Sequence, residues 1–379
     1  MRLNIDPEEF LRKHWQREPL FLAKGMANFE PPGDADELAG LALEDHVDSQ
    51  IVRRSASGWT KETGPFDEAS LQQTGAWSLL VQSVDHYWDS AAALLSAVSF
   101  LPSWRLDDVM MSYATDGGSA GPHFDNYDVF IIQGEGRRRW QLGQRCNEKT
   151  ALLPAQDLRL IADFEAAAEF EMEQGDVLYI PPGVAHYGIS LGESTSFSIG
   201  FRAPRIDALL ARWVDDRLES FDANRLMQDP GRAPANAPGE IMAEDLECIR
   251  EQLRVAMETI SPVTVGEVVT EDSLPPSDGL SDELGDGLGD GLGDEAVACY
   301  LQEAQQVYRD PTARLAFFDD GDSLLIFANG QSHRVSLSLR PSMVALCAGS
   351  AIKTESLRAP EGVAMLQWLW AARGIVCDD

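Results

Sequence analysis

His123 and Asp125 open the stretch that most constrains this chain, GPHFDNYDVFIIQGEGRRRW. Alternate side chains of a β-strand share one face, so we expect both to point the same way. A further histidine, His186, follows an expected strand from Asp176 to Ile180 and a double-proline turn. Two histidines and one carboxylate around a common point form the facial triad of non-haem Fe(II) sites. The three residues therefore predict a metal centre that leaves coordination positions open.

A structural interpretation of the same residues competes with this one. The pattern H-x-D occurs by chance, a lone histidine on a strand is commonly a hydrogen-bonded structural residue, and Asp125 can cap a turn. Three features favour the metal. The pattern follows a glycine-rich loop, TDGGSAGP, and precedes an apolar strand, Val129 to Ile132. His186 comes after the turn GDVLYIPPG, and the short strands in between are what a barrel needs to bring the two ends together.

Longer motifs connect this stretch to a known family. The segments HFD, QGEGRRRW and GDVLYIPPGVAH resemble the JmjC branch of the cupin-type Fe(II)/2-oxoglutarate oxygenases. With FLRKHWQREPLFLAKG, DELAGLA, WSLLVQSVDHY and SIGFRAPR, the chain is similar to the bacterial ribosomal oxygenases, the arginine 3-hydroxylases of large-subunit ribosomal protein L-sixteen. The resemblance covers roughly residues 1–205 closely and the remainder in general layout.

The expected fold is mainly β with added helices. Many short strands with Gly and Pro turns fit a double-stranded β-helix, the jelly roll of cupin and JmjC proteins. We expect this catalytic domain over 1–205, a helical region over 206–270, an acidic linker over 271–294 and a winged-helix-like module over 295–379. The resemblance implies that the helical region forms a homodimer; docking of its apolar face on the barrel is the alternative.

Individual elements follow from periodicity and turn signals. The first helix is expected to bury Phe10, Leu11 and Trp15 on one face. Helices are expected at 5–17, from 34, at 86–101, 155–168, 206–221, 241–260, 296–309, 340–349 and 361–373. A hairpin is expected from LAFF through DDGD to LLIF, with a further turn at Asn329-Gly330. The linker, with its period-four L-G-D-G repeat, is expected to be disordered; a calcium loop is disfavoured because such loops place aspartates at alternate positions.

Charge and composition limit the partners. The net charge is −32, which repels nucleic acid and attracts basic proteins, although solubility or a salt-adapted host also accounts for it. No apolar run approaches the ~20 residues that span a bilayer, and the start of the chain lacks the apolar core of a signal peptide. Five scattered cysteines fit a reducing compartment. A cytoplasmic enzyme with a basic ribosomal protein as partner is expected.

The resemblance also implies a co-substrate. His123, Asp125 and His186 would hold Fe(II) and carry the catalysis, and 2-oxoglutarate would chelate the metal. The far carboxylate of 2-oxoglutarate needs a cation, and the planar fork of arginine suits it. By strand alternation Arg138 faces away from its two arginine neighbours, and matching the family pattern places this role on Arg138. Ser112 would add a hydroxyl.

Two residues near the triad are candidates for holding a guanidinium-bearing substrate. Asp116 lies in the glycine-rich loop, and Tyr127 follows Asp125 closely. A carboxylate and an aromatic wall both suit a cationic side chain. Asp116 is equally well suited to stabilising the loop itself, so both interpretations stay open.

Three functions fit these observations. The first is a hydroxylase that modifies an arginine of a ribosomal protein. The second uses the same chemistry as a JmjC-type demethylase or as another 2-oxoglutarate oxygenase acting on small molecules. The third is a non-catalytic metal-binding cupin. A buried cation facing the metal argues against the third, and the acidic surface with its additional C-terminal regions argues against a small-molecule enzyme.

Overall fold

The computed structural model describes residues 2–55, 58–154, 158–220, 226–234, 237, 239, 241–256, 260–271 and 304–377. These residues fall into two compact units, one ending at Ala203 and the other starting at Pro204. Beyond Glu271, the expected acidic linker lies outside the described residues.

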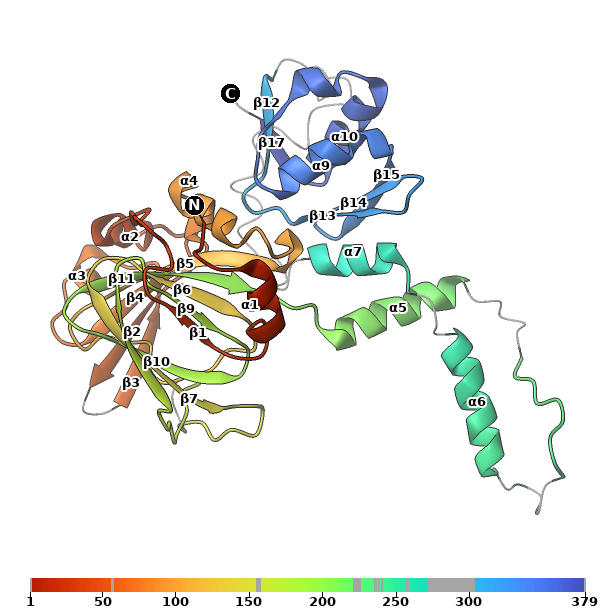
Figure 1. Cartoon of the computed structure of the whole chain (residues 1–379), viewed down its shortest axis with the longest axis horizontal. Coiled ribbons are helices and arrows are strands. Elements are labelled where there is room, and N and C mark those ends of the chain that lie inside the picture. Colours follow the sequence, from red (N-terminus) through yellow and green to blue (C-terminus); the bar gives the residue numbers. More distant parts are fainter. Residues whose placement is uncertain are drawn as a thin grey trace. The chain divides into compact units, whose positions relative to one another are not determined.

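The first unit consists of two antiparallel sheets that face each other (Figure 1). The larger sheet runs in the order β1 (Leu20–Leu22), β9 (Val177–Ile180), β6 (Val129–Gln133), β11 (Ser194–Phe201), β5 (Leu106–Ala114), β4 (Trp77–Val81), β2 (Ser49–Ser55), β3 (Gly58–Thr63). The smaller sheet runs in the order β10 (Val184–Ser190), β7 (Arg137–Arg145), β8 (Ala168–Glu173). This is the predicted double-stranded β-helix.

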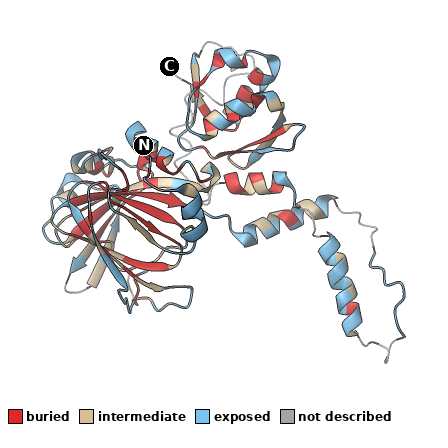
Figure 2. Cartoon of the chain, viewed as in Figure 1, coloured by how far each residue is buried: buried red, intermediate tan, exposed pale blue. Residues whose placement is uncertain are grey.

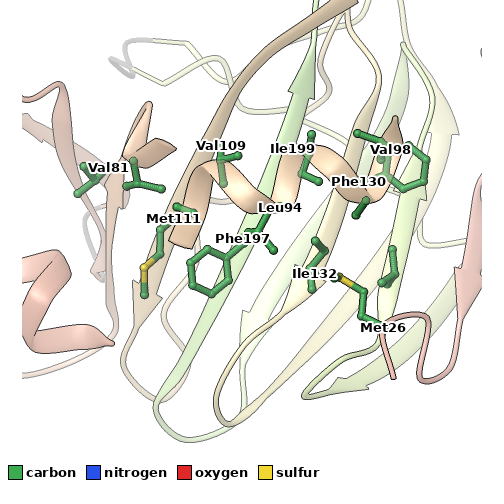
Figure 3. Close-up of a cluster of buried hydrophobic side chains, with 14 of the residues drawn as sticks. Met26, Val81, Leu94, Val98, Val109, Met111, Phe130, Ile132, Phe197 and Ile199 are labelled. Atoms are coloured by element: carbon green, nitrogen blue, oxygen red, sulfur yellow. The ribbon is translucent and has the colours of Figure 1, made fainter. Parts of the chain in front are cut away.

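The two faces of β11 show why the barrel closes. In STSFSIGF, every second residue from Phe197 is apolar, and Phe197 and Ile199 join the core on the outer face of the larger sheet (Figure 3). The intervening serines face the space between the sheets. Burying a large apolar side chain stabilises a fold by about 1.5–3 kcal/mol, so the outer face fixes the register. Both faces of β11 are buried, as Figure 2 shows for the centre of the barrel.

Short helices cover the outer face of the larger sheet. They are α1 (Pro7–Lys13), α2 (Ala35–Leu41), α3 (Glu68–Leu71), α4 (Asp89–Ala92) and the 3-10 turns η1 (Val84–His86), η2 (Ala93–Val98) and η3 (Ser103–Arg105). Asp6 caps α1 by accepting from the backbone N–H groups of Glu8 and Glu9. Asp34 and Glu37 form a reciprocal capping box on α2.

Three predicted helices of the first unit differ from the structure. The first ends at Lys13, its Leu11 is 40% exposed, and Gln16 adopts a left-handed backbone. The helix expected over 86–101 is broken into η1, α4 and η2, because Trp88 has an extended backbone. The helix expected over 155–168 is absent from its described part, residues 158–168. There the Ile161 N–H donates to Pro122 O and Leu160 O accepts from Leu153, so the backbone pairs with loops instead.

The second unit joins a helical region to a small α/β module. Its helices and 3-10 turns are α5 (Ile206–Ser220), α6 (Ala243–Ala256), α7 (Pro262–Thr270), η4 (Leu337–Leu339), α9 (Arg340–Cys347), η5 (Thr354–Leu357) and α10 (Pro360–Ala371). Its strands are β12 (Gln306–Arg309), β13 (Leu315–Asp319), β14 (Leu324–Ala328), β15 (Gln331–Val335), β16 (Ile352–Lys353) and β17 (Ile375–Cys377). None of the described helices is long and apolar enough to cross a membrane.

The turn chemistry of this module was predicted correctly. β13 and β14 form the expected hairpin, and Asn329 and Gly330 have the positive φ angles that a tight hairpin turn requires. The helix expected over 296–309 is wrong at its end, because 306–309 form β12 between β16 and β17. Its residues 296–303 lie outside the described part of the chain.

Candidate metal centre

His123, Asp125 and His186 converge at the barrel interior. One ligand atom from each lies within 4.8 Å of the others. Asp125 Oδ2 is 3.4 Å from His186 Nε2 and 4.0 Å from His123 Nε2. Metal–ligand bonds of about 2 Å place adjacent octahedral ligands about 3 Å apart, so small side-chain movements complete the geometry. The donor set, two imidazoles and a carboxylate, fits Fe(II).

Backbone pairing, rather than a shared strand, brings the two histidines together. His123 lies in the loop between β5 and β6, so the expectation that it shares a strand face with Asp125 is wrong. It forms an isolated bridge with His186, in which each N–H donates to the other residue's carbonyl at 3.1 and 2.8 Å. Gly183 N–H donates to Asp125 O at 2.7 Å and holds the third residue. The double-proline turn ending at Gly183 thus positions two of the three side chains.

Both imidazoles are held in the tautomer that a metal needs. His123 Nδ1 lies 2.8 Å from Gly121 O, and His186 Nδ1 lies 3.0 Å from Val184 O. A carbonyl oxygen only accepts, so each Nδ1 carries the hydrogen and each Nε2 lone pair faces the cluster. Burial, with the neighbouring His123, lowers the pKa of His186 to about 4, so this ring is neutral at physiological pH.

Arg138 is a buried cation on the same interior surface. Its Nη1 donates to the hydroxyls of Ser112 and Ser196, both at 2.9 Å, and its Nε donates to Ser194 Oγ at 3.2 Å. Burial lowers the pKa of Arg138 to about 10, so the group remains charged at neutral pH. Its partners among the described residues are serines, and no carboxylate there forms an ion pair with it. A buried charge without a counter-ion is costly, which favours an anionic ligand at this position.

The neighbouring arginines face the other way, as strand alternation predicted. Arg137 is exposed. Arg139 lies on the outer face of the smaller sheet and pairs with Glu169 and Glu171 at 3.5 and 3.2 Å. Only Arg138 of this run is buried.

The pairing of β7 with β10 relates the cation to the cluster. Arg138 lies opposite Ser190, and Leu142 lies opposite His186. Four residues of strand separate the two levels, roughly 13 Å at ~3.3 Å per residue. Trp140 lies between them, with its ring centroid 6.0 Å from that of His186. The barrel interior therefore holds the candidate metal ligands and the Arg138 cation at different heights along β7 and β10.

The serines around Arg138 include members that sequence reasoning missed. Ser112 was predicted, but Ser194 and Ser196 on β11 also accept from Arg138, and Ser190 on β10 hydrogen-bonds to Ser194. Their signal is the alternation S-T-S-F-S-I, which places small polar residues opposite an apolar face. Without the cross-strand register, this pattern is also that of an ordinary half-exposed strand.

The two substrate candidates have different surroundings. Asp116 is exposed, and its Oδ1 accepts from Gly192 N at 2.8 Å, which supports a role in holding the loop. Tyr127 is 46% exposed. Its partial burial and the adjacent Asp125 carboxylate raise the pKa of Tyr127, so the phenol stays protonated. Tyr127 thus lies beside the metal cluster.

The fold and this site together define a JmjC-type protein. Residues 93–209 match the JmjC domain family. The chain is 40% identical to the ribosomal protein uL16 3-hydroxylase of Escherichia coli over 252 residues, which are 66% of this chain and 67% of that protein. It is 34% identical to a probable ribosomal oxygenase of Haemophilus influenzae over 262 residues, 66% of this chain and 64% of that protein.

Solved structures agree over the whole length. The structure of the ribosomal oxygenase YcfD from Escherichia coli matches with a TM-score of 0.78 and 32% identity, covering 100% of this chain and 99% of that one. Another structure of YcfD is a complex with cobalt and 2-oxoglutarate. The chain belongs to the bacterial ribosomal oxygenases of the JmjC family, which confirms the predicted resemblance.

Proposed function

We propose that this protein is an Fe(II)- and 2-oxoglutarate-dependent hydroxylase of a large-subunit ribosomal protein, and that its target is an arginine side chain of protein L-sixteen (uL16). The observation that carries the proposal is the His–Asp–His cluster in the same barrel as an uncompensated buried arginine. Family membership supplies the substrate class.

His123, Asp125 and His186 hold the metal. Bound Fe(II) supplies oxygen activation coupled to the decarboxylation of 2-oxoglutarate to succinate. The chain's own contribution is to present two neutral imidazoles and one carboxylate from one side, so that co-substrate and oxygen have room. The Gly121 and Val184 carbonyls fix the two rings.

Arg138 receives the far carboxylate of 2-oxoglutarate. Its guanidinium is already oriented by the serine hydroxyls, so little conformational freedom is lost on binding. Ser112 is shared between Arg138 and Ser196, and its hydroxyl is able to turn towards the ligand. The incoming carboxylate compensates the buried positive charge.

Asp116 and Tyr127 contact the substrate side chain in this proposal. Tyr127 lies next to a metal ligand and offers an aromatic face to a guanidinium. Asp116 keeps one oxygen on Gly192 and has a second oxygen for the substrate. The acidic chain as a whole attracts a basic protein and disfavours direct contact with nucleic acid.

The second unit forms a homodimer in this proposal. Its helices α5 and α6 expose many large apolar residues, which favours their burial against a second copy of the chain. They are Ile206, Leu210, Val214, Leu218, Leu246, Ile249, Leu253 and Val255. The domain limits are those expected from the sequence, 1–205, 206–270, 271–294 and 295–379, and the enzyme acts in the cytoplasm.

Mass spectrometry tests the proposal. The protein is incubated with Fe(II), 2-oxoglutarate and purified uL16, and the gain of one oxygen on an arginine is the expected result. Omitting 2-oxoglutarate is the control. Loss of a methyl group from a methylated substrate without oxygen gain would instead identify a demethylase. Metal binding without any turnover of 2-oxoglutarate would identify a non-catalytic cupin.

A further inference from the structure

Asp128, three residues after Asp125, lies at the centre of a buried polar network. It is 1% exposed and directly precedes β6. Tyr179 Oη donates to its Oδ1 at 2.5 Å, and Gln16 Nε2 donates to its Oδ2 at 3.0 Å. Arg105 Nη2 lies 3.8 Å from the same Oδ2. The Asp128 carbonyl accepts from Phe201 N at 3.0 Å.

The partners of Asp128 are themselves fixed from several elements. Tyr179 Oη also accepts from Gln16 N at 2.8 Å, and the ring of Trp15 stacks on that of Tyr179. Arg105 packs over the Trp15 ring and donates from Nε to Arg202 O at 2.6 Å. The network therefore joins the segment after α1, strand β9 and the end of β11 at one carboxylate.

Asp128 ends the loop that carries a metal-binding candidate. The Asp125 backbone is held through its carbonyl, by Gly183 N. Its carboxylate hydrogen-bonds with the Tyr127 side chain and lies 3.4 Å from His186 Nε2. The next two residues, Asn126 and Tyr127, are exposed. Asp128 is the first buried side chain after Asp125, so its network determines where the loop returns to the core. A displacement at Asp128 is transmitted to Asp125 through only three peptide units.

We propose that Asp128 is a positioning residue for the metal centre, acting with Tyr179 to hold Asp125 in its ligating position. This rests on the proposed metal site. Burying a carboxylate is unfavourable unless both of its oxygens are bonded. Both oxygens of Asp128 accept from donors in separate segments of the chain. These bonds compensate the burial of the carboxylate and also fix the position of the Asp128 backbone. Hydrogen bonds made to metal ligands typically change metal affinity 10–100-fold when removed, which sets the scale of the effect expected for a residue that positions a ligand through the loop.

Co(II) binding tests the role, because the absorption spectrum of bound Co(II) reports its ligand geometry independently of turnover. The variants are Asp128→Asn and Tyr179→Phe in the full chain. The matched control is Asp176→Asn, a carboxylate of similar burial that accepts from Lys24 N and Glu173 N. Asp176 lies at the opposite end of β6, beside Gln133. Thermal unfolding without metal measures the structural effect of each variant.

We expect Asp128→Asn to weaken Co(II) binding about 10–100-fold and to shift its absorption bands, with Asp176→Asn close to the unmodified chain. Tyr179→Phe removes one hydroxyl, retains the ring, and should show the same effect more weakly even if Asp128→Asn does not fold. His186→Ala removes a ligand candidate and should lose Co(II) binding. If it does so while Tyr179→Phe keeps the affinity and spectrum of the unmodified chain, the positioning role alone is overturned. Unchanged Co(II) binding in His186→Ala would overturn the metal site and this inference together.

Discussion

At the scale of single residues, charge and burial decide what each side chain can do. Arg138 and Arg139 are chemically identical neighbours, yet one is buried among serines and the other pairs with surface glutamates. The difference arises from strand alternation alone. Predictions for single substitutions therefore depend on which face a residue occupies.

Replacing a metal-binding candidate should abolish turnover without unfolding the chain. Asp125→Ala removes the only carboxylate of the cluster, and the side chain is partly solvent-exposed, so the fold should persist. Succinate formation from 2-oxoglutarate measures activity, and circular dichroism measures folding. Asn126→Ala, an exposed neighbour, is the matched control and should keep its activity. Full activity in Asp125→Ala would contradict the metal assignment.

Arg138→Ala should raise the KM for 2-oxoglutarate by a factor of hundreds or more. Removing one partner of a buried ion pair costs about 3–5 kcal/mol, and each 1.4 kcal/mol is tenfold. Arg137→Ala and Arg139→Ala, on the outer face, should change KM less than about threefold, because exposed charges contribute ~0–1 kcal/mol. Steady-state kinetics compares the three. A larger effect at Arg137 than at Arg138 would refute the proposed role of the buried arginine.

Asp108 should make stability depend on pH. Burial raises the pKa of Asp108 to about 6 from an ordinary value of 3.8, so folding favours the protonated acid. That contribution is fully present below about pH 4 and is lost as pH rises through about 6. The difference corresponds to about 3 kcal/mol. Asp108→Asn stays neutral, so its stability relative to the unmodified chain should increase between pH 4 and 7 in urea unfolding. A constant difference would contradict this.

The site was predictable from the sequence where its signals are local. His123, Asp125, His186 and Arg138 each stand out through a short motif or through alternation. The serines that orient Arg138 come from two strands, β5 and β11, and the sequence contains no signal for their cross-strand pairing. The hydrogen-bond network at Asp128 was not predictable from the sequence either, because its donors come from residues distant in the chain.

At the scale of elements, local turn chemistry was a better guide than helical periodicity. The Asn329-Gly330 turn and the β13–β14 hairpin form as expected, since positive φ angles are a property of the turn residues themselves. The helix expected over 86–101 is interrupted, and the described part of the one expected over 155–168 does not form. In the second case, the Ile161 N–H donates to Pro122 O in the loop before His123, so a tertiary contact overrides helix propensity. Where an element packs therefore matters more than its own preference.

Two glycine substitutions should have opposite effects on their elements. A Cβ added at Gly188 on β10 would meet the Trp140 ring at 2.8 Å, so Gly188→Ala should destabilise the fold by about 1–3 kcal/mol. At Gly40 in α2 nothing lies within 4 Å of the added Cβ. Gly40→Ala should stabilise by about 0.4–1 kcal/mol. Urea unfolding measures both, and a stabilised Gly188→Ala would show that Trp140 is not packed against β10.

At the scale of the whole molecule, net charge should control the rate at which the enzyme associates with its protein substrate. A chain with a net charge of −32 attracts a basic protein over distances set by the Debye length, ~10 Å at 0.1 M salt and ~3 Å at 1 M. The value of kcat/KM for intact uL16 should therefore fall as NaCl is raised over this range. The uncoupled turnover of 2-oxoglutarate without protein substrate is the control, because its binding group is buried and less screened. Equal salt dependence in both reactions would show that salt acts on the site itself, and a salt-independent kcat/KM would show that the acidic surface does not guide the substrate.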